Sequence, residues 1–170
     1  MSTDKSILQQ LNKFRHSATL IVGIGNILKA DDGAGPIVCE QLKRAKVCAE
    51  LIDAGTVPEN YIQPIIKKAP QNLLVIDAID FGASPGTIRI FGPEQLNSLA
   101  ISTHTLSPRL FVDMVCRNIK RDPALREPLD VYFVGIQPAQ TQLGQPVSEP
   151  VSQAIQKLSQ ALTDIFPPKQ

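Results

Sequence analysis

The chain has 170 residues, which suits one domain, and 43% of them are hydrophobic, which is enough for one buried core. Its 17 basic and 16 acidic residues leave a formal net charge of +1, so neither nucleic acid nor a membrane surface is an expected partner. Charged residues interrupt the apolar positions of the N-terminus, and no apolar run approaches the roughly 20 residues that cross a bilayer. We therefore expect a soluble cytoplasmic enzyme.

Apolar runs alternate with amphipathic segments along the chain, which predicts strands that alternate with helices. Residues 1–18 are expected to form a helical extension that precedes a domain over residues 19–170. The expected strands are 19–25, 49–54, 72–78, 87–91 and 130–135, and the expected helices are 36–44, 60–68, 106–119 and 149–166. Residues 92–105 are expected to be polar, with at most one helical turn. This alternation predicts an α/β fold with an open sheet.

In open α/β sheets, sites form beyond the carboxyl ends of the strands. Several carboxylates follow the predicted strands directly, so this edge of the sheet is the first functional indication. The residues expected there are Gly25 and Asn26 with the loop that carries Asp31 and Asp32, then Asp53, Asp77 and Gln137.

Motifs for nucleotide binding are incomplete. Gly23 and Gly25 begin a G-x-G-x-x-G fingerprint, but Leu28 takes the third glycine position. The loop that follows carries two aspartates, which disfavour a phosphate. No Walker A sequence is present in the chain. Asp53 resembles the ribose-binding acid of such sites, so nucleotide binding stays open as an alternative.

Motifs for nucleophilic and dyad catalysis also fail. Residues 82–86 match G-x-S-x-G, but a strand pattern rather than a helix follows Ser84, so we interpret this segment as a turn. Neighbouring side chains such as Asp31 and Asp32 do not face each other on a helix, which disfavours an aspartic dyad. The three cysteines form no C-x-x-C pair and are expected to be free thiols.

One constellation remains, and it consists of Asp32, Asp77 and His104. Two carboxylates and an imidazole suit a divalent metal, and three protein ligands leave a coordination position open. Each residue also has a structural alternative. Asp32 could complement a helix dipole, Asp77 could form a turn at the strand end, and His104 could be a solvated loop residue.

The sequence resembles the hydrogenase maturation peptidase family. The segment GIGNILKADDGAGP at residues 23–36 is similar to the family signature G-x-G-N-x-L-x-x-D-[DE]-G-x-G. Further similar segments follow in the family order, so the resemblance covers roughly residues 19–165. They are DAGTVPEN at 53–60, LLVIDAIDFGASPGTIRIF at 73–91, STHTLS at 102–107 and VYFVGIQP at 131–138. The wording is most similar to the branch that serves formate-hydrogenlyase-type, energy-converting hydrogenases.

The resemblance implies a single-domain α/β/α sandwich around a twisted, mostly parallel five-stranded sheet. It implies an endopeptidase, traditionally classed as aspartic-type, that trims the C-terminal extension of a [NiFe]-hydrogenase large-subunit precursor. The family's metal ligands fall on Asp32, Asp77 and His104, and Asp53 corresponds to an acid near the cleavage site. Nickel is expected to arrive with the precursor, while zinc or cadmium can occupy the same site. We expect a monomer.

The resemblance leaves the mechanism open. The metal could polarise the scissile carbonyl or activate a water, or Asp53 could act as general base with the metal used only for recognition. The alternative to an enzyme is a non-catalytic accessory module that binds nickel or a nucleotide.

Overall fold

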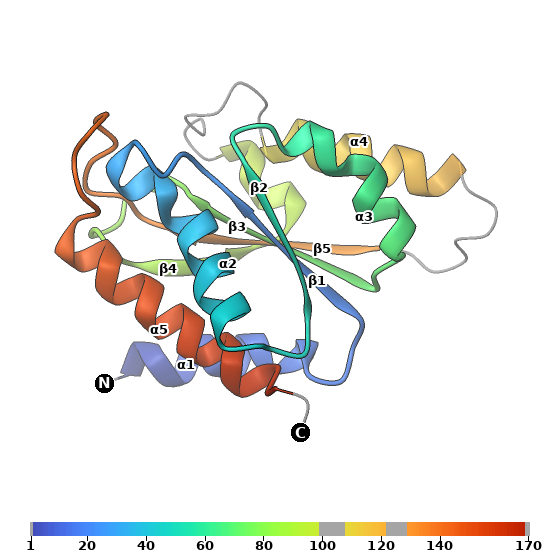
Figure 1. The fold of residues 1–170 in the computed structure, drawn as a ribbon, viewed down its shortest axis with the longest axis horizontal. Helices are drawn as coiled ribbons and strands as arrows, with labels where there is room; N and C mark the ends of the chain where they lie inside the picture. The colour runs from blue at the N-terminus through green and yellow to red at the C-terminus, as the bar shows by residue number, and fades with distance from the viewer. Residues whose placement is uncertain (1, 99–107, 122–128, 169–170) are drawn as a thin grey trace.

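The computed structural model describes residues 2–98, 108–121 and 129–168, and its centre is a five-stranded sheet in the order β2-β1-β3-β5-β4. Neighbouring strands are parallel except that β4 runs antiparallel to β5 (Figure 1). The predicted mostly parallel five-stranded sheet is therefore confirmed. The strands are β1 (Thr19–Ile24), β2 (Glu50–Gly55), β3 (Asn72–Ala78), β4 (Ile88–Phe91) and β5 (Asp130–Ile136).

Helices cover both faces of the sheet and complete an α/β/α sandwich (Figure 1). On one face lie α1 (Ser2–Leu11), α2 (Ala34–Arg44) and α5 (Glu149–Ile165), and on the other lie α3 (Ile62–Lys68) and α4 (Pro108–Arg121). Short 3-10 helices add η1 (Asn12–Phe14), η2 (Ala30–Gly33), η3 (Pro58–Tyr61) and η4 (Pro93–Ser98). No helix among the described residues is long and apolar enough to cross a membrane.

Burial on both faces of the sheet explains the apolar sequences of β1 and β3. Every residue of β1 is buried, and in β3 only Asn72 is not fully so. Alternate side chains enter separate cores, as Ile21 packs with α2 and α5 whereas Leu20 packs with α3 and α4. A strand buried on both faces reads as a continuous apolar run rather than an alternating one.

The N-terminal helix α1 belongs to the core beneath α5. Ile7, Leu11 and Phe14 are buried in the same cluster as the α5 side chains. The segment therefore packs against the sheet layer. The boundary at residues 18 and 19 stays a prediction.

Two segments contain more helix than predicted. Residues 92–105 were expected to hold at most one helical turn, which is wrong because η4 has six residues, or about two turns of a 3-10 helix. Pro93 opens this helix, and the side chain of Gln95 accepts a hydrogen bond from Gly92 N at 2.7 Å. The expected helix over 60–68 is likewise preceded by η3, which begins at Pro58.

Candidate functional site

The site begins where α2 lies directly on the ends of β1 and β3. A Cβ atom on Gly35 would come within 2.3 Å of the Ile24 carbonyl oxygen and 2.4 Å of the Ile76 carbonyl oxygen. Likewise, a Cβ on Gly23 would lie 2.5 Å from Gly35 O. Only glycine permits this approach, so the glycines of the signature bring the first turn of α2 to the carboxyl edge of the sheet.

Asp32 lies in η2, immediately before α2, and is 1% exposed. Its Oδ2 accepts a hydrogen bond from Asn26 N at 3.2 Å. Its backbone oxygen lies so close to Gly25 that a Cβ there would approach within 1.9 Å, and Gly25 has a φ of 148°. The turn after β1 thus holds Asp32 in place from both its backbone and its side chain.

Asp77 is the second carboxylate at this edge, and it is fully buried near the end of β3. Its position depends on β3 being a neighbour of β1, which the sheet order confirms. Ile76 pairs with Gly23, so Asp77 lies one residue beyond that pair, and η2 contacts β3. The structure therefore brings the segments that carry Asp32 and Asp77 together.

Asp53 lies on the opposite face of the sheet from Asp77. Leu51 packs with the α2 core and Ile52 with the α3 core, so alternation along β2 directs Asp53 to the α2 face. By the same alternation, Val75 and Asp77 of β3 are directed to the face of α3 and α4. The carboxylate of Asp53 is exposed, and its Oδ1 accepts a hydrogen bond from Gly55 N at 3.1 Å.

Cys39 of α2 lies close enough to Asp53 to be affected by its charge, which agrees with Asp53 being on the α2 face. Burial, together with the nearby Asp53 charge, raises the pKa of the Cys39 thiol to about 12. Its Sγ also lies 3.6 Å from the carbonyl oxygen of Ile52. Cys39 is a free thiol, as expected, and it stays protonated at neutral pH, which makes it a poor nucleophile.

The third expected ligand, His104, lies outside the described residues. Helix α4 begins four residues later along the chain, at Pro108. Within the ranges that the structure describes, no group of three His, Cys, Asp or Glu side chains is placed to hold a metal.

Asp31 has a role that sequence reasoning missed. Its side chain is fully buried and accepts hydrogen bonds from the segment that joins β5 to α5. The donors are Ala139 N at 2.8 Å, Gln140 N at 3.0 Å, Ser148 N at 2.6 Å and Ser148 Oγ at 2.9 Å. Because these partners lie more than 100 residues away in the sequence, no local pattern could have indicated them.

Gln137 joins the end of β5 to the turn after β3. Its Oε1 accepts hydrogen bonds from Phe81 N and Ala83 N, and its Nε2 donates to Asp80 Oδ1 at 3.0 Å. This bond and one from Gly82 N lower the pKa of Asp80. Gln137 therefore fixes the loop next to Asp77.

The segment 82–86 is a turn, as expected. Ser84 O accepts hydrogen bonds from both the backbone nitrogen and the hydroxyl of Thr87, and strand β4 follows. This arrangement lacks the helix that a nucleophile elbow requires.

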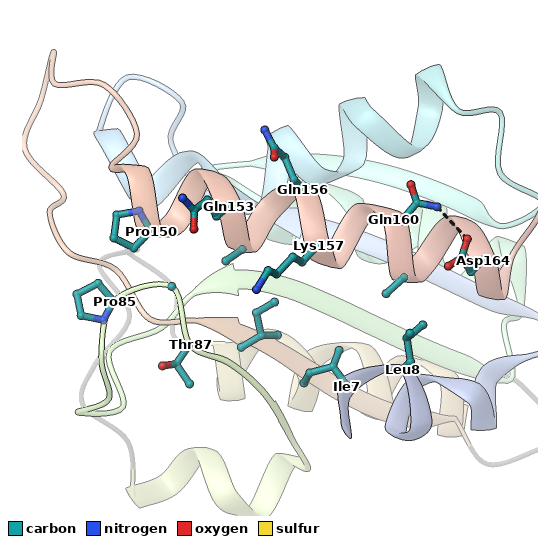
Figure 2. Close-up of a pocket in the computed structure, with 14 residues that line it drawn as sticks. Ile7, Leu8, Pro85, Thr87, Pro150, Gln153, Gln156, Lys157, Gln160 and Asp164 are labelled. Atoms are coloured by element: carbon teal, nitrogen blue, oxygen red, sulfur yellow. Dashed lines mark hydrogen bonds between the residues drawn. The ribbon is translucent and has the colours of Figure 1, made fainter. Parts of the chain in front are cut away.

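A groove of about 710 Å³ lies between α1, α5 and the start of β4 (Figure 2). Ile7 and Leu8 line one side of it, and Lys157 extends from α5 on the other. Neither Asp32 nor Asp77 lines it. The groove is therefore separate from the carboxylates at the ends of the strands.

Comparisons with known proteins decide the family. A sequence model described as hydrogenase maturation protease matches residues 36–165. The chain is 32% identical to the hydrogenase 3 maturation protease of Escherichia coli over 145 residues, which cover 84% of this chain and 87% of that protein. The chain belongs to the hydrogenase maturation protease family.

Solved structures of this family share the fold. The HycI maturation protease of Thermococcus kodakarensis superposes with a TM-score of 0.79 at 28% identity, covering 92% of this chain and 97% of that one. The Escherichia coli endopeptidase HycI gives 0.74 at 32% identity, with coverage of 86% and 90%. The predicted resemblance is confirmed, and this hydrogenase maturation protease is a peptidase rather than a non-catalytic module.

Proposed function

We propose that this protease removes the C-terminal extension of a [NiFe]-hydrogenase large-subunit precursor after nickel has entered that precursor. One observation carries the proposal. Two buried carboxylates, Asp32 and Asp77, belong to segments that meet at the carboxyl edge of the sheet, beside the first turn of α2. The family supplies the proteolytic activity. We expect the enzyme to act as a cytoplasmic monomer.

In this proposal Asp32, Asp77 and His104 bind the nickel ion that the precursor carries. Two carboxylates and one imidazole suit a divalent ion, and they leave coordination positions for the precursor's own ligands. The nickel is therefore part of the substrate, and its presence selects the precursors that are ready for cleavage. Zinc and cadmium accept similar donors, so either ion is expected to occupy these residues when precursor is absent.

Cleavage requires an activated water and a polarised carbonyl, and the substrate's nickel can supply both effects. Asp53 is assigned to the peptide near the cleavage site, as a general base or as a hydrogen-bond acceptor. It lies on β2, two strands from β3 and therefore about 10 Å across the sheet, and on the opposite face. This separation favours contact of Asp53 with the extended substrate chain rather than with the metal.

The test is the mass of a nickel-loaded precursor after incubation with the purified protease. We expect loss of a C-terminal peptide with the wild-type chain, and no loss with Asp32→Ala, Asp77→Ala or His104→Ala. Each variant is also titrated with nickel, because loss of a ligand should weaken metal binding on the order of tenfold or more. Asp130→Asn serves as control, since Asp130 is an exposed carboxylate at the start of β5, the end of the strand away from Asp32 and Asp77. An unchanged precursor mass with the wild-type chain would refute the proposal.

A further inference from the structure

Two loops at the carboxyl edge carry exposed apolar side chains that the proposed chemistry does not use. Ile27 is 66% exposed and Leu28 is 63% exposed in the loop after β1, and Leu143 is 70% exposed in the segment between β5 and α5. Among the described residues, these are the three most exposed of the five large hydrophobic side chains at the surface. Exposed apolar groups that gather at one place mark interaction sites more often than isolated ones do.

The two loops are joined, although they lie more than 100 residues apart in the sequence. Gly144 N donates a hydrogen bond to Leu28 O at 2.8 Å, which places Leu143 beside Leu28. Within the first loop, Leu28 N donates to Asn26 Oδ1 at 2.9 Å. Asp31 holds the second loop through the hydrogen bonds described above. The apolar side chains are thus displayed on a fixed backbone.

This apolar surface is continuous with the candidate metal ligands. Ile27 follows Asn26, whose backbone nitrogen donates to the carboxylate of Asp32. The Cα atom of Ile27 also lies against η2, since a Cβ on Gly33 would approach it within 2.9 Å. A polypeptide bound at Asp32 therefore has this surface directly beside it.

We infer that Ile27, Leu28 and Leu143 form a docking surface for an apolar segment of the hydrogenase precursor next to its cleavage site. The inference rests on the proposed function, because that function places the precursor at Asp32. Three side chains cannot supply the roughly 800 Å² per partner that a stable dimer buries. A substrate that must leave after cleavage suits a small apolar contact of this kind, because short-lived complexes use smaller interfaces.

The double variant Leu28→Ser/Leu143→Ser tests the docking surface with nickel-loaded precursor. Each leucine side chain that becomes buried on docking contributes to the binding free energy of the precursor. KM should therefore rise on the order of tenfold per substitution, while kcat stays unchanged. Both side chains are exposed, so the thermal midpoint should not change. Leu143→Met, which keeps the apolar area, and Gln142→Ser, which alters the neighbouring exposed residue, should both retain the wild-type KM.

Two results would overturn the inference. The first is a KM of the double variant within about twofold of the wild-type value. The second combines sedimentation with kinetics: the wild-type chain self-associates, the double variant does not, and the two proteins have equal KM for the precursor. A second copy of the chain would then be the occupant of this surface. If the wild-type chain does not cleave the precursor, the proposed function fails. The docking surface is still tested in that case by comparing the affinity of the wild type and of the double variant for labelled precursor.

Discussion

The carboxylate of Asp31 accepts two hydrogen bonds from Ser148, one from its backbone nitrogen at 2.6 Å and one from its hydroxyl at 2.9 Å. Ser148 is the N-cap residue of α5, so the negative charge of Asp31 lies at the positive end of that helix. Asp31 also directly precedes Asp32 in η2. One buried side chain thus ties the start of α5 to the turn that carries a proposed metal ligand.

Replacement of Asp31 by asparagine should destabilise the fold. The amide group has one acceptor oxygen where the carboxylate has two, so some N–H donors of the 139–148 segment lose their partner. We expect a loss of about 2–4 kcal/mol in the free energy of unfolding, measured by urea denaturation. Asp53→Asn is the matched control, because its exposed side chain keeps an oxygen for Gly55 N. Equal stability of the two variants would contradict the role of Asp31.

Gly35→Ala should also destabilise the protein, although alanine is the better helix former by about 1 kcal/mol. The new Cβ would meet the carbonyl oxygens of Ile24 and Ile76, which are backbone atoms and cannot move aside. We expect a net loss of about 1–3 kcal/mol by urea denaturation.

Gly82→Ala separates steric contact from backbone conformation. Gly82 has a φ of 72°, and no atom of the described residues lies within 4 Å of the place that a Cβ would take, so this variant carries the left-handed backbone cost of about 1–2 kcal/mol. In addition, Gly35→Ala should lower the processing rate, because α2 must shift away from the strand ends. A Gly35→Ala protein as stable and active as the wild type would contradict the close contact.

Cysteine labelling should distinguish Cys39 from Cys48. Cys39 is buried with a pKa of about 12, whereas Cys48 is exposed. At pH 8 we expect iodoacetamide to modify Cys48 and to leave Cys39 unmodified in the native protein, as measured by mass spectrometry of the digested protein. Because the folded pKa of Cys39 lies above its ordinary value of 9.0, its contribution to stability is complete below pH 9 and falls as the pH rises towards 12. Rapid labelling of native Cys39 would contradict its burial.

Asp80 should make the stability of the fold depend on pH in the acid range. Hydrogen bonds from Gln137 and Gly82 lower its pKa below the ordinary value of 3.8. A lowered folded pKa gives a contribution that is present above pH 3.8 and is lost as the pH falls through the folded pKa. We expect the thermal midpoints of the wild type and Asp80→Asn to differ near neutral pH and to converge in acid. A difference that is constant over that range would contradict the assignment.

The sequence predicted β3 residue for residue, because an apolar run buried on both faces has clear ends. It also placed Asp32 and Asp77 at one edge, since parallel strands end on the same side. It could not separate Asp53 from Asp77, because the face to which each side chain points depends on the register between β1 and its two neighbours. The role of Asp31 was hidden because its partners come from a distant segment, and η4 was missed because polar 3-10 turns have no apolar period.

The bonds between Asp31 and the 139–148 segment have a consequence for the synthesis of the protein. Chains grow from the N-terminus, and domains generally fold as units once their parts are available. Residue 31 emerges early, yet its carboxylate can accept the hydrogen bonds from Ser148 only after the chain has grown past residue 148. A nascent or truncated chain that ends before residue 139 would therefore carry the complete signature but lack the bonds that tie its turn to the start of α5. On this view, a protease that trims the end of another protein becomes competent only when its own last helix is in place.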